Sequence, residues 1–166
     1  MTDEPVTDNP VPARLFGKLP AHGDFVARGV TPSEQASLDT WLTTSLAAAQ
    51  ARFGVGGGGD FVDRFDAALP WQGSGPGTIG VIAASQDASG RRYPLVLLCA
   101  AADDIDGLIY AAIVDRWDAD RLAAAAGNGA DPAASIERWV SHDGAASLDG
   151  ATPIDIVTAM LERVGV

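Results

Sequence analysis

The polar side chains of residues 17–28 form the densest group in the chain that could do chemistry. One ammonium, one imidazole, one carboxylate and one guanidinium lie within this stretch, on Lys18, His22, Asp24 and Arg28. A histidine near a carboxylate can act as a general base, so Lys18, His22 and Asp24 are the best catalytic constellation in the sequence. The same groups could instead serve structure or an interface, with Asp24 accepting amides of its own turn and pairing with Lys18 or Arg28. We favour this second interpretation.

The flanking residues predict how this group is held. Residues 15–16 enter the stretch as the end of a strand would. Residues 20–23 favour a turn, because proline fixes φ at the second turn position and glycine suits the fourth. The apolar residues 25–26 then return the chain to the core. We therefore expect the four polar side chains to cluster at one edge of the domain.

A second polar group lies at the return of a predicted hairpin. Arg91 and Arg92 are adjacent there, and on an acidic protein they form a local positive spot. Their guanidinium groups could bind the carboxylates or phosphates of a partner. Alternatively, one of them pairs with Asp87 across the turn while the other is solvated.

Four tryptophans divide into two groups. Trp41, Trp117 and Trp139 lie on apolar stripes of predicted helices, and we expect them in the core. Trp71 lies between Pro70 and a glycine-rich loop, so we expect it to be the exposed tryptophan. An exposed aromatic residue in a loop is a good anchor for a partner.

Several kinds of cofactor and catalytic site are disfavoured. Residues 75–80 fit the letters of a dinucleotide fingerprint, but they run into a strand rather than a helix. His22, His142 and the single Cys99 have no spacing suited to zinc, and no Gly-x-Ser-x-Gly nucleophile motif occurs. Cys99 lies in an apolar strand, so we expect a buried, reduced thiol. We therefore expect no cofactor, no metal and no catalytic residue.

The net negative charge of the chain disfavours some classes of partner. The formal net charge is −11, from 22 acidic and 11 basic residues. Nucleic acids and anionic membranes are poor partners for such a chain, because both need a basic surface. The longest apolar run, residues 94–102, is about half of what spans a bilayer, and the acidic first residues do not resemble a secretory signal. We expect a cytoplasmic protein with no direct membrane insertion.

Hydrophobic periodicity and capping signals predict the elements that position these groups. A helix begins after Thr31, which caps it, with Pro32 in the first turn and Glu34 completing a capping box. Apolar residues then recur at helical spacing as far as Phe53. The other predicted elements are strands at 11–18, 61–69, 78–85 and 93–101, a glycine-rich loop at 72–77, and helices at 104–126, from 131 and from 152.

These elements predict a tail followed by one domain. Residues 1–12 are acidic and rich in proline, so we expect a disordered acidic tail, with a single domain over residues 13–166. The strands at 78–85 and 93–101 are apolar on both faces, as in a central hairpin covered on each side. The predicted fold class is α/β, with a mainly antiparallel sheet sandwiched by helices in three layers.

Two of the motifs carry a family resemblance. Residues 17–26 resemble the Gly-Lys-Leu-Pro-x-x-Gly-Asp-Phe-Val signature that opens the TagF family, which is associated with type VI secretion. Residues 87–95 resemble the family's Gly-Arg-x-Tyr/Phe-Pro-Leu hairpin. Trp41-Leu42 lies where the family has a Trp-Asp-x-Trp-Leu helix start, although Leu38 replaces the first tryptophan. The resemblance covers roughly residues 14 to 125.

The resemblance implies a function by binding rather than by catalysis. Members of the family look like post-translational repressors that sequester a forkhead-associated scaffold protein of the secretion system, and their fold is of the longin or profilin kind. The alternative is a small hydrolase or transferase that uses the turn at Lys18, His22 and Asp24. The oligomeric state stays open between a monomer and a weak homodimer. The residues that we expect to contact a partner are Lys18, Asp24, Arg28, Trp71 and Arg91.

Overall fold

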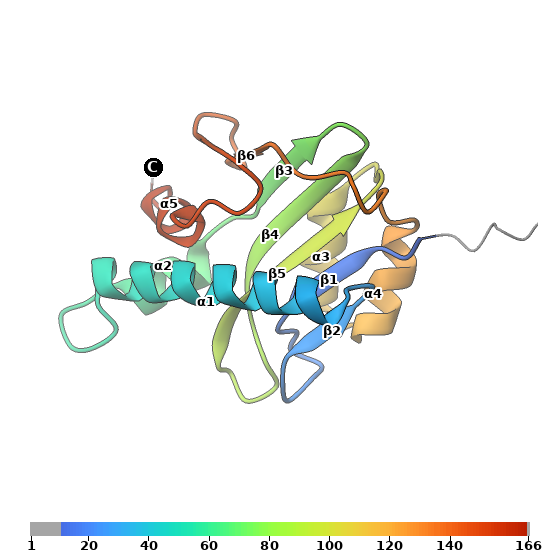
Figure 1. Ribbon diagram of the computed structural model, residues 1–166. Coiled ribbons are helices and arrows are strands. Elements are labelled where there is room, and N and C mark those ends of the chain that lie inside the picture. The colour runs from blue at the N-terminus through green and yellow to red at the C-terminus, as the bar shows by residue number, and fades with distance from the viewer. Residues whose placement is uncertain (1–10, 166) are drawn as a thin grey trace, which may run out of the picture.

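A seven-stranded antiparallel sheet runs through the computed structural model, which describes residues 11–165 (Figure 1). The strand order is β2-β1-β5-β4-β3-β6-β7, and every neighbouring pair is antiparallel. The predicted antiparallel sheet and its central β4–β5 hairpin are confirmed. The strands are β1 (Arg14–Gly17), β2 (Val26–Arg28), β3 (Trp71–Gly75), β4 (Thr78–Gln86), β5 (Arg92–Cys99), β6 (Arg138–Val140) and β7 (Ser147–Asp149).

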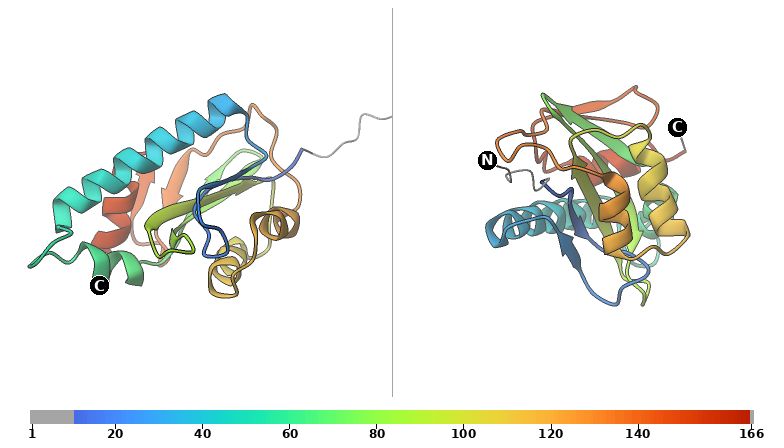
Figure 2. Two further views of the ribbon diagram at one scale, coloured as in Figure 1. Left: turned by 90° about the horizontal axis from the view of Figure 1, so that it is seen from below. Right: turned by 90° about the vertical axis from the view of Figure 1, so that its right-hand side faces the viewer.

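Helices cover both faces of the sheet, as the predicted sandwich requires (Figure 2). One face carries α1 (Pro32–Phe53), α2 (Phe61–Ala67) and α5 (Ile156–Glu162), and the other carries α3 (Ile105–Val114) and α4 (Ala119–Ala126). Successive strand residues point to opposite faces, so Ile82 packs in the cluster beneath α1 and Val81 in the cluster beneath α3. Within residues 11–165, no helix is long and apolar enough to cross a bilayer.

Helix α1 begins as the sequence predicts. The Thr31 hydroxyl accepts a hydrogen bond from the Glu34 amide at 3.1 Å, and the Glu34 carboxylate accepts one from the Thr31 amide at 2.8 Å. The helix ends at Gly54, whose φ of 82° suits glycine. Its buried stripe contacts the sheet and α5, which is tied to α1 by the Val157 amide donating to the Ser45 hydroxyl at 3.0 Å.

The prediction of a strand at 61–69 is wrong, because this segment forms α2. Phe61 and Phe65 are both buried, with ring centroids 5.5 Å apart. A spacing of four places two residues on one face of a helix and also on one face of a strand. The apolar pattern alone therefore could not separate the two structures.

The predictions of a loop at 72–77 and of a helix from 131 are wrong for one shared reason. Residues 71–75 form β3, which pairs with β6, where Gly73 lies opposite Trp139. A Cβ atom at Gly73 would come within 2.9 Å of the Trp139 and Ile136 side chains. The glycine thus leaves room inside a strand for a buried indole, rather than marking a flexible loop.

The helix predicted over 104–126 is two helices. Arg116 adopts a left-handed backbone with φ of 56°, which ends the helical path between α3 and α4. Asp118 then caps α4 by accepting a hydrogen bond from the Arg121 amide at 2.8 Å. The last predicted helix also starts later than expected, at Ile156 instead of 152.

The predicted tail lies outside the described residues except for Val11 and Pro12. The Val11 carbonyl accepts a hydrogen bond from the Gly129 amide at 2.6 Å, and Pro12 bridges to Asn128. These two residues are thus attached to the end of the sheet.

The capping box predicts a measurable cost for removing its hydroxyl. We expect Thr31→Ala to lower the free energy of unfolding by about 1 kcal/mol, because an amide of the first turn loses its acceptor. Thr40→Ala, an exposed change in the middle of the same helix, is the control and should have no such cost. Urea denaturation of both variants measures the difference. Equal stabilities would show that the box does not stabilise α1.

Candidate functional site

The two sequence motifs form one structural feature, which we call the hairpin corner (residues 17–25 and 85–94). The β1–β2 loop and the β4–β5 turn lie at the same end of the sheet, at the bottom of Figure 1. The Ala88 amide donates to the His22 carbonyl at 2.7 Å, and the Arg91 guanidinium donates to the Gly23 carbonyl at 2.8 Å. The sequence predicted two polar groups, but it did not predict that the two loops are joined by hydrogen bonds.

The backbones of the two motifs meet at Gly17 and Pro94. Gly17 has φ of 139°, and a Cβ atom there would overlap the carbonyl oxygen of Pro94. Only glycine permits this approach together with this backbone conformation. The first residue of one motif is thus shaped by contact with the other.

A buried ion pair joins the two loops inside the corner. The Lys18 ammonium lies 3.2 Å from the Asp87 carboxylate, and Lys18 is only 7% exposed. Asp87 also accepts hydrogen bonds from the Ser89 amide at 2.9 Å, the Arg91 amide at 3.0 Å and the Arg91 guanidinium at 2.7 Å. Burial alone would raise the pKa of Asp87, but the hydrogen bonds from Arg91, Lys18 and Ser89 lower it to about 2.

An aromatic cluster completes the corner. The Phe25 ring stacks on Phe16 with a centroid distance of 5.8 Å and lies perpendicular to the Tyr93 ring, with their centroids 4.8 Å apart. The Lys18 ammonium lies 4.8 Å from the centroid of the same ring. Burial raises the pKa of Tyr93 to about 12, although a hydrogen bond with Thr43 opposes the shift. Phe25 is nevertheless 45% exposed, so it presents a fixed aromatic surface to the outside.

The charged side chains of the first motif do not pair with one another. Asp24 accepts from the Phe25 amide at 2.7 Å, as one prediction held, but it pairs with neither Lys18 nor Arg28. Arg28 instead lies 2.6 Å from Asp120, at the start of α4. The prediction that Asp24 pairs with Lys18 or Arg28 is therefore wrong, because both cations pair with aspartates of other segments.

The two arginines of the second motif are both paired. Arg91 pairs with Asp87 across the turn, as one alternative predicted, and its side chain is 63% exposed. Arg92 is not free in solvent, because its guanidinium donates to both oxygens of Asp66 at 2.7 Å. That pairing joins the hairpin to α2.

Trp71 is buried, so its predicted role as an exposed anchor is wrong. It is 2% exposed, and it lies in the core cluster beneath α1. Trp71 begins β3, and strand alternation turns its side chain inward. Two aromatic residues that the sequence analysis did not single out are exposed, Phe25 and Tyr110, and of these Phe25 belongs to the hairpin corner. Phe25 directly follows the glycine and aspartate of the turn, and this position could have indicated that its side chain is exposed.

The groups of the catalytic hypothesis are not assembled into a site. No hydrogen bond or ion pair joins any two of Lys18, His22 and Asp24. The His22 Nε2 atom accepts a hydrogen bond from the Ala119 amide at 3.0 Å, so it serves the first turn of α4. In the part of the chain that the structure describes, no three His, Cys, Asp or Glu side chains are placed to hold a metal ion.

The other candidate residues have structural surroundings. Cys99 is buried in β5, and burial raises the pKa of its thiol. His142 lies in a turn after β6, with Nδ1 3.3 Å from Asp106. Hydrogen bonds from Ser141, Ala145 and Arg163 hold the pKa of Asp143, in the same turn, well below its usual range.

The pKa of Asp87 predicts how stability depends on pH. The folded pKa of Asp87, about 2, lies below its ordinary value of 3.8. The ionised carboxylate therefore contributes fully to the free energy of unfolding above about pH 4, and this contribution is lost as the pH falls to about 2. We expect Asp87→Asn to be destabilising at pH 7, because Lys18 loses its buried counter-charge. The difference from wild type should shrink between about pH 4 and pH 2. Urea denaturation at several pH values measures it.

The control for this experiment is Asp115→Asn, an exposed change outside the corner. It should leave the pH dependence of unfolding as in the wild type. A difference between wild type and Asp87→Asn that stays constant down to pH 2 would contradict the assignment.

Comparisons with known proteins support one family. The TagF N-terminal domain family, described as type VI secretion system-associated, matches residues 14–143. The fold is similar to the crystal structure of PA0076 from Pseudomonas aeruginosa PAO1, with a TM-score of 0.58, 22% identity, and coverage of 91% of this chain and 77% of that one. No curated protein matches the chain. Because the matched segment includes the whole hairpin corner and most of the sheet, the chain belongs to the TagF family of type VI secretion-associated proteins.

Proposed function

We propose that this chain is a post-translational negative regulator of type VI secretion that acts by binding. It holds a forkhead-associated scaffold protein away from the assembling apparatus, and it converts no substrate. Family membership supplies the association with type VI secretion. We also propose that the chain binds the scaffold protein in the cytoplasm. The observation that carries it is the hairpin corner, in which a buried ion pair supports an exposed aromatic ring and an exposed guanidinium.

The corner has the properties of a binding surface formed in advance. The Phe25 ring is held by Phe16 and Tyr93, and the Arg91 guanidinium is held by Asp87 and Gly23. Side chains already fixed in one conformation lose less entropy when a partner binds. Aromatic residues and arginine also contribute a large share of binding free energy at protein interfaces.

The roles of the remaining predicted residues follow from their positions. Asp24 is exposed beside Phe25, so it adds a negative charge to the proposed surface. Arg28 lies on β2 at the margin of the corner, paired with Asp120. Lys18 is buried and supports the surface from beneath rather than touching the partner. Trp71 has no part in this surface.

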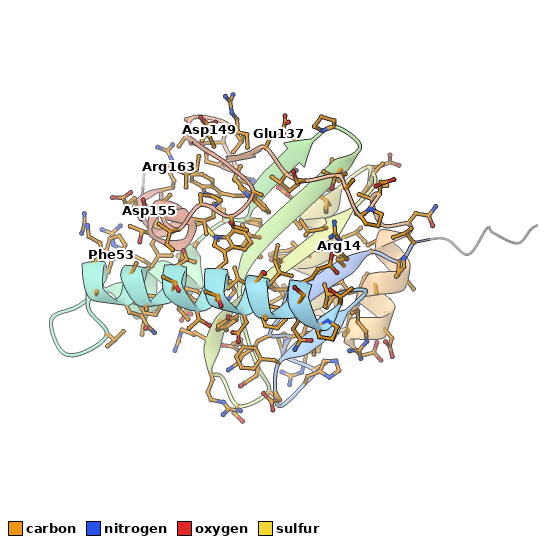
Figure 3. All side chains as sticks on the ribbon, in the orientation of Figure 1. Arg14, Phe53, Glu137, Asp149, Asp155 and Arg163 are labelled. Carbon is orange, nitrogen blue, oxygen red and sulfur yellow. The ribbon has the colours of Figure 1, made fainter. Side chains whose placement is uncertain are left out.

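Binding of the purified scaffold to the immobilised chain tests the proposal. We expect Phe25→Ala and Arg91→Glu each to weaken the affinity by about 30-fold, as the loss of a central interface residue does. Arg138→Glu is the matched control, because Arg138 is 60% exposed and also pairs with an aspartate, Asp149. Asp149 lies at the opposite end of the molecule from the corner (Figure 3). Binding should survive this change.

Two results would contradict the proposal. Failure of the scaffold to bind the wild-type chain would remove the sequestration mechanism. An equal loss of affinity in Arg138→Glu would show that overall charge, rather than the hairpin corner, governs the interaction.

A further inference from the structure

Strand β4 has an open edge next to the hairpin corner. β3 pairs with β4 only from Thr78 to Ile82, whereas β5 pairs with β4 as far as Gln86. No other strand of the described chain lies beside residues 83–86 on the β3 side. The sheet therefore has a gap beside residues 83–86 of β4, where the pairing on the β3 side has stopped.

The register shows which backbone groups face this gap. The Asp87 amide donates to the Arg91 carbonyl at 3.1 Å, so Asp87 and the odd-numbered residues before it exchange hydrogen bonds with β5. The amide and carbonyl groups of Ala84 and Gln86 consequently point to the open side. Pro94, opposite Ala84, has no amide to offer, which agrees with this register. Within residues 11–165, no group forms a hydrogen bond with these outward-facing backbone atoms.

The gap is a groove with walls from both helical layers. Its volume is about 340 Å³. Phe65, Asp66 and Ala68 come from α2 and the residues after it, and Ile113 and Val114 come from the end of α3. Phe65 belongs to the core cluster on the α1 side of the sheet, whereas Ile113 packs against the cluster on the α3 side. A strand placed in the groove would thus have a helix above it and another below it, like the central strands.

One unpaired cation lies in the groove. Arg116 donates to the Pro20 carbonyl at 2.8 Å, and it has no acidic side chain within ion-pair distance among the described residues. Only Arg121 shares this property among the lysines and arginines of residues 11–165, and its guanidinium lies 4.2 Å from the Trp117 ring centroid. On a chain with a net charge of −11, such a cation favours a carboxylate-bearing ligand.

We propose that an extended segment of a partner protein binds beside Ala83–Gln86 as an added strand and places a carboxylate side chain on Arg116. Backbone donors and acceptors that alternate along an edge match a polypeptide backbone, which is the basis of recognition by strand addition. The proposal rests on the function proposed above, and it adds the chemistry of the bound segment. Pro20 and Ser85 belong to both the groove and the hairpin corner, so one partner can contact both surfaces.

Amide hydrogen exchange, followed by NMR on the isotope-labelled full chain, tests strand addition residue by residue. We expect the amides of Ala84 and Gln86 to exchange about ten-fold more slowly, or more slowly still, when the scaffold is bound. The amides of Ala83 and Ser85 already face β5, so they should be protected in both states. This alternation is an internal control, because a general stabilisation of the fold would not slow exchange at alternate amides only.

A variant pair tests the charge contact. Arg116→Gly should weaken binding about ten-fold, because a hydrogen-bonded ion pair is lost. Glycine accepts the left-handed backbone at this position, so the variant should fold. Arg121→Ala removes the other unpaired guanidinium and should leave the affinity unchanged.

The outcomes separate this proposal from the proposed function. If the scaffold binds while the exchange of Ala84 and Gln86 is unchanged, the groove proposal is wrong and the proposed function stands. If the scaffold does not bind, the proposed function fails, and a synthetic ten-residue peptide of alternating valine and threonine with one central glutamate becomes the probe. Unchanged exchange with this peptide too would overturn strand addition.

Two other occupants would also overturn the proposal. In the isolated chain, protection of the Ala84 and Gln86 amides could increase with protein concentration. That result would show that a second copy of the chain occupies the groove. Protection that does not depend on concentration and disappears when residues 1–10 are deleted would show that the chain's own N-terminal segment occupies the groove.

Discussion

The buried ion pair between Lys18 and Asp87 is the interaction on which the hairpin corner depends. Two loops from distant parts of the sequence end at one place, and each supplies one charge. Withdrawing two charges from water is costly unless both are well satisfied. Asp87 meets this condition with three further hydrogen bonds, and Lys18 lies against the Phe25 ring. The pair therefore holds the two loops together, because moving them apart would leave the buried Lys18 ammonium without its counter-charge.

The position of Phe25 follows from this arrangement. A partly exposed phenylalanine on a free loop would turn toward the interior, but here the ring is held by stacking on Phe16 and by a perpendicular contact with Tyr93. The remaining surface stays outside together with the Arg91 guanidinium. The groove beside β4 begins immediately behind this corner, at Pro20 and Ser85. The two proposed contact surfaces are thus continuous parts of one end of the sheet.

Local signals in the sequence were sufficient where the physical cause was also local. The capping box at Thr31 and the apolar strands of the β4–β5 hairpin could be read directly, because neighbouring residues determine them. The segment at 61–69 could not, since a spacing of four fits both periodicities. Gly73 resembled a loop residue because Trp139, the side chain that needs its space, is distant in the sequence. The partners of Lys18 and Arg28 likewise lie on other elements, so the candidate site could be located from sequence while its pairing could not.

The C-terminal helix α5 shows that a family boundary and a structural boundary need not coincide. The family match ends at residue 143, yet Ile156, Val157, Met160 and Leu161 are buried against the stripe of α1, and the Trp41 indole donates to the Pro153 carbonyl at 2.8 Å. A fragment cut at the end of the matched segment would expose this stripe to water. Exposed apolar surface of that kind promotes self-association. Recombinant fragments that end where the family match ends would therefore be expected to aggregate, whatever the state of the hairpin corner.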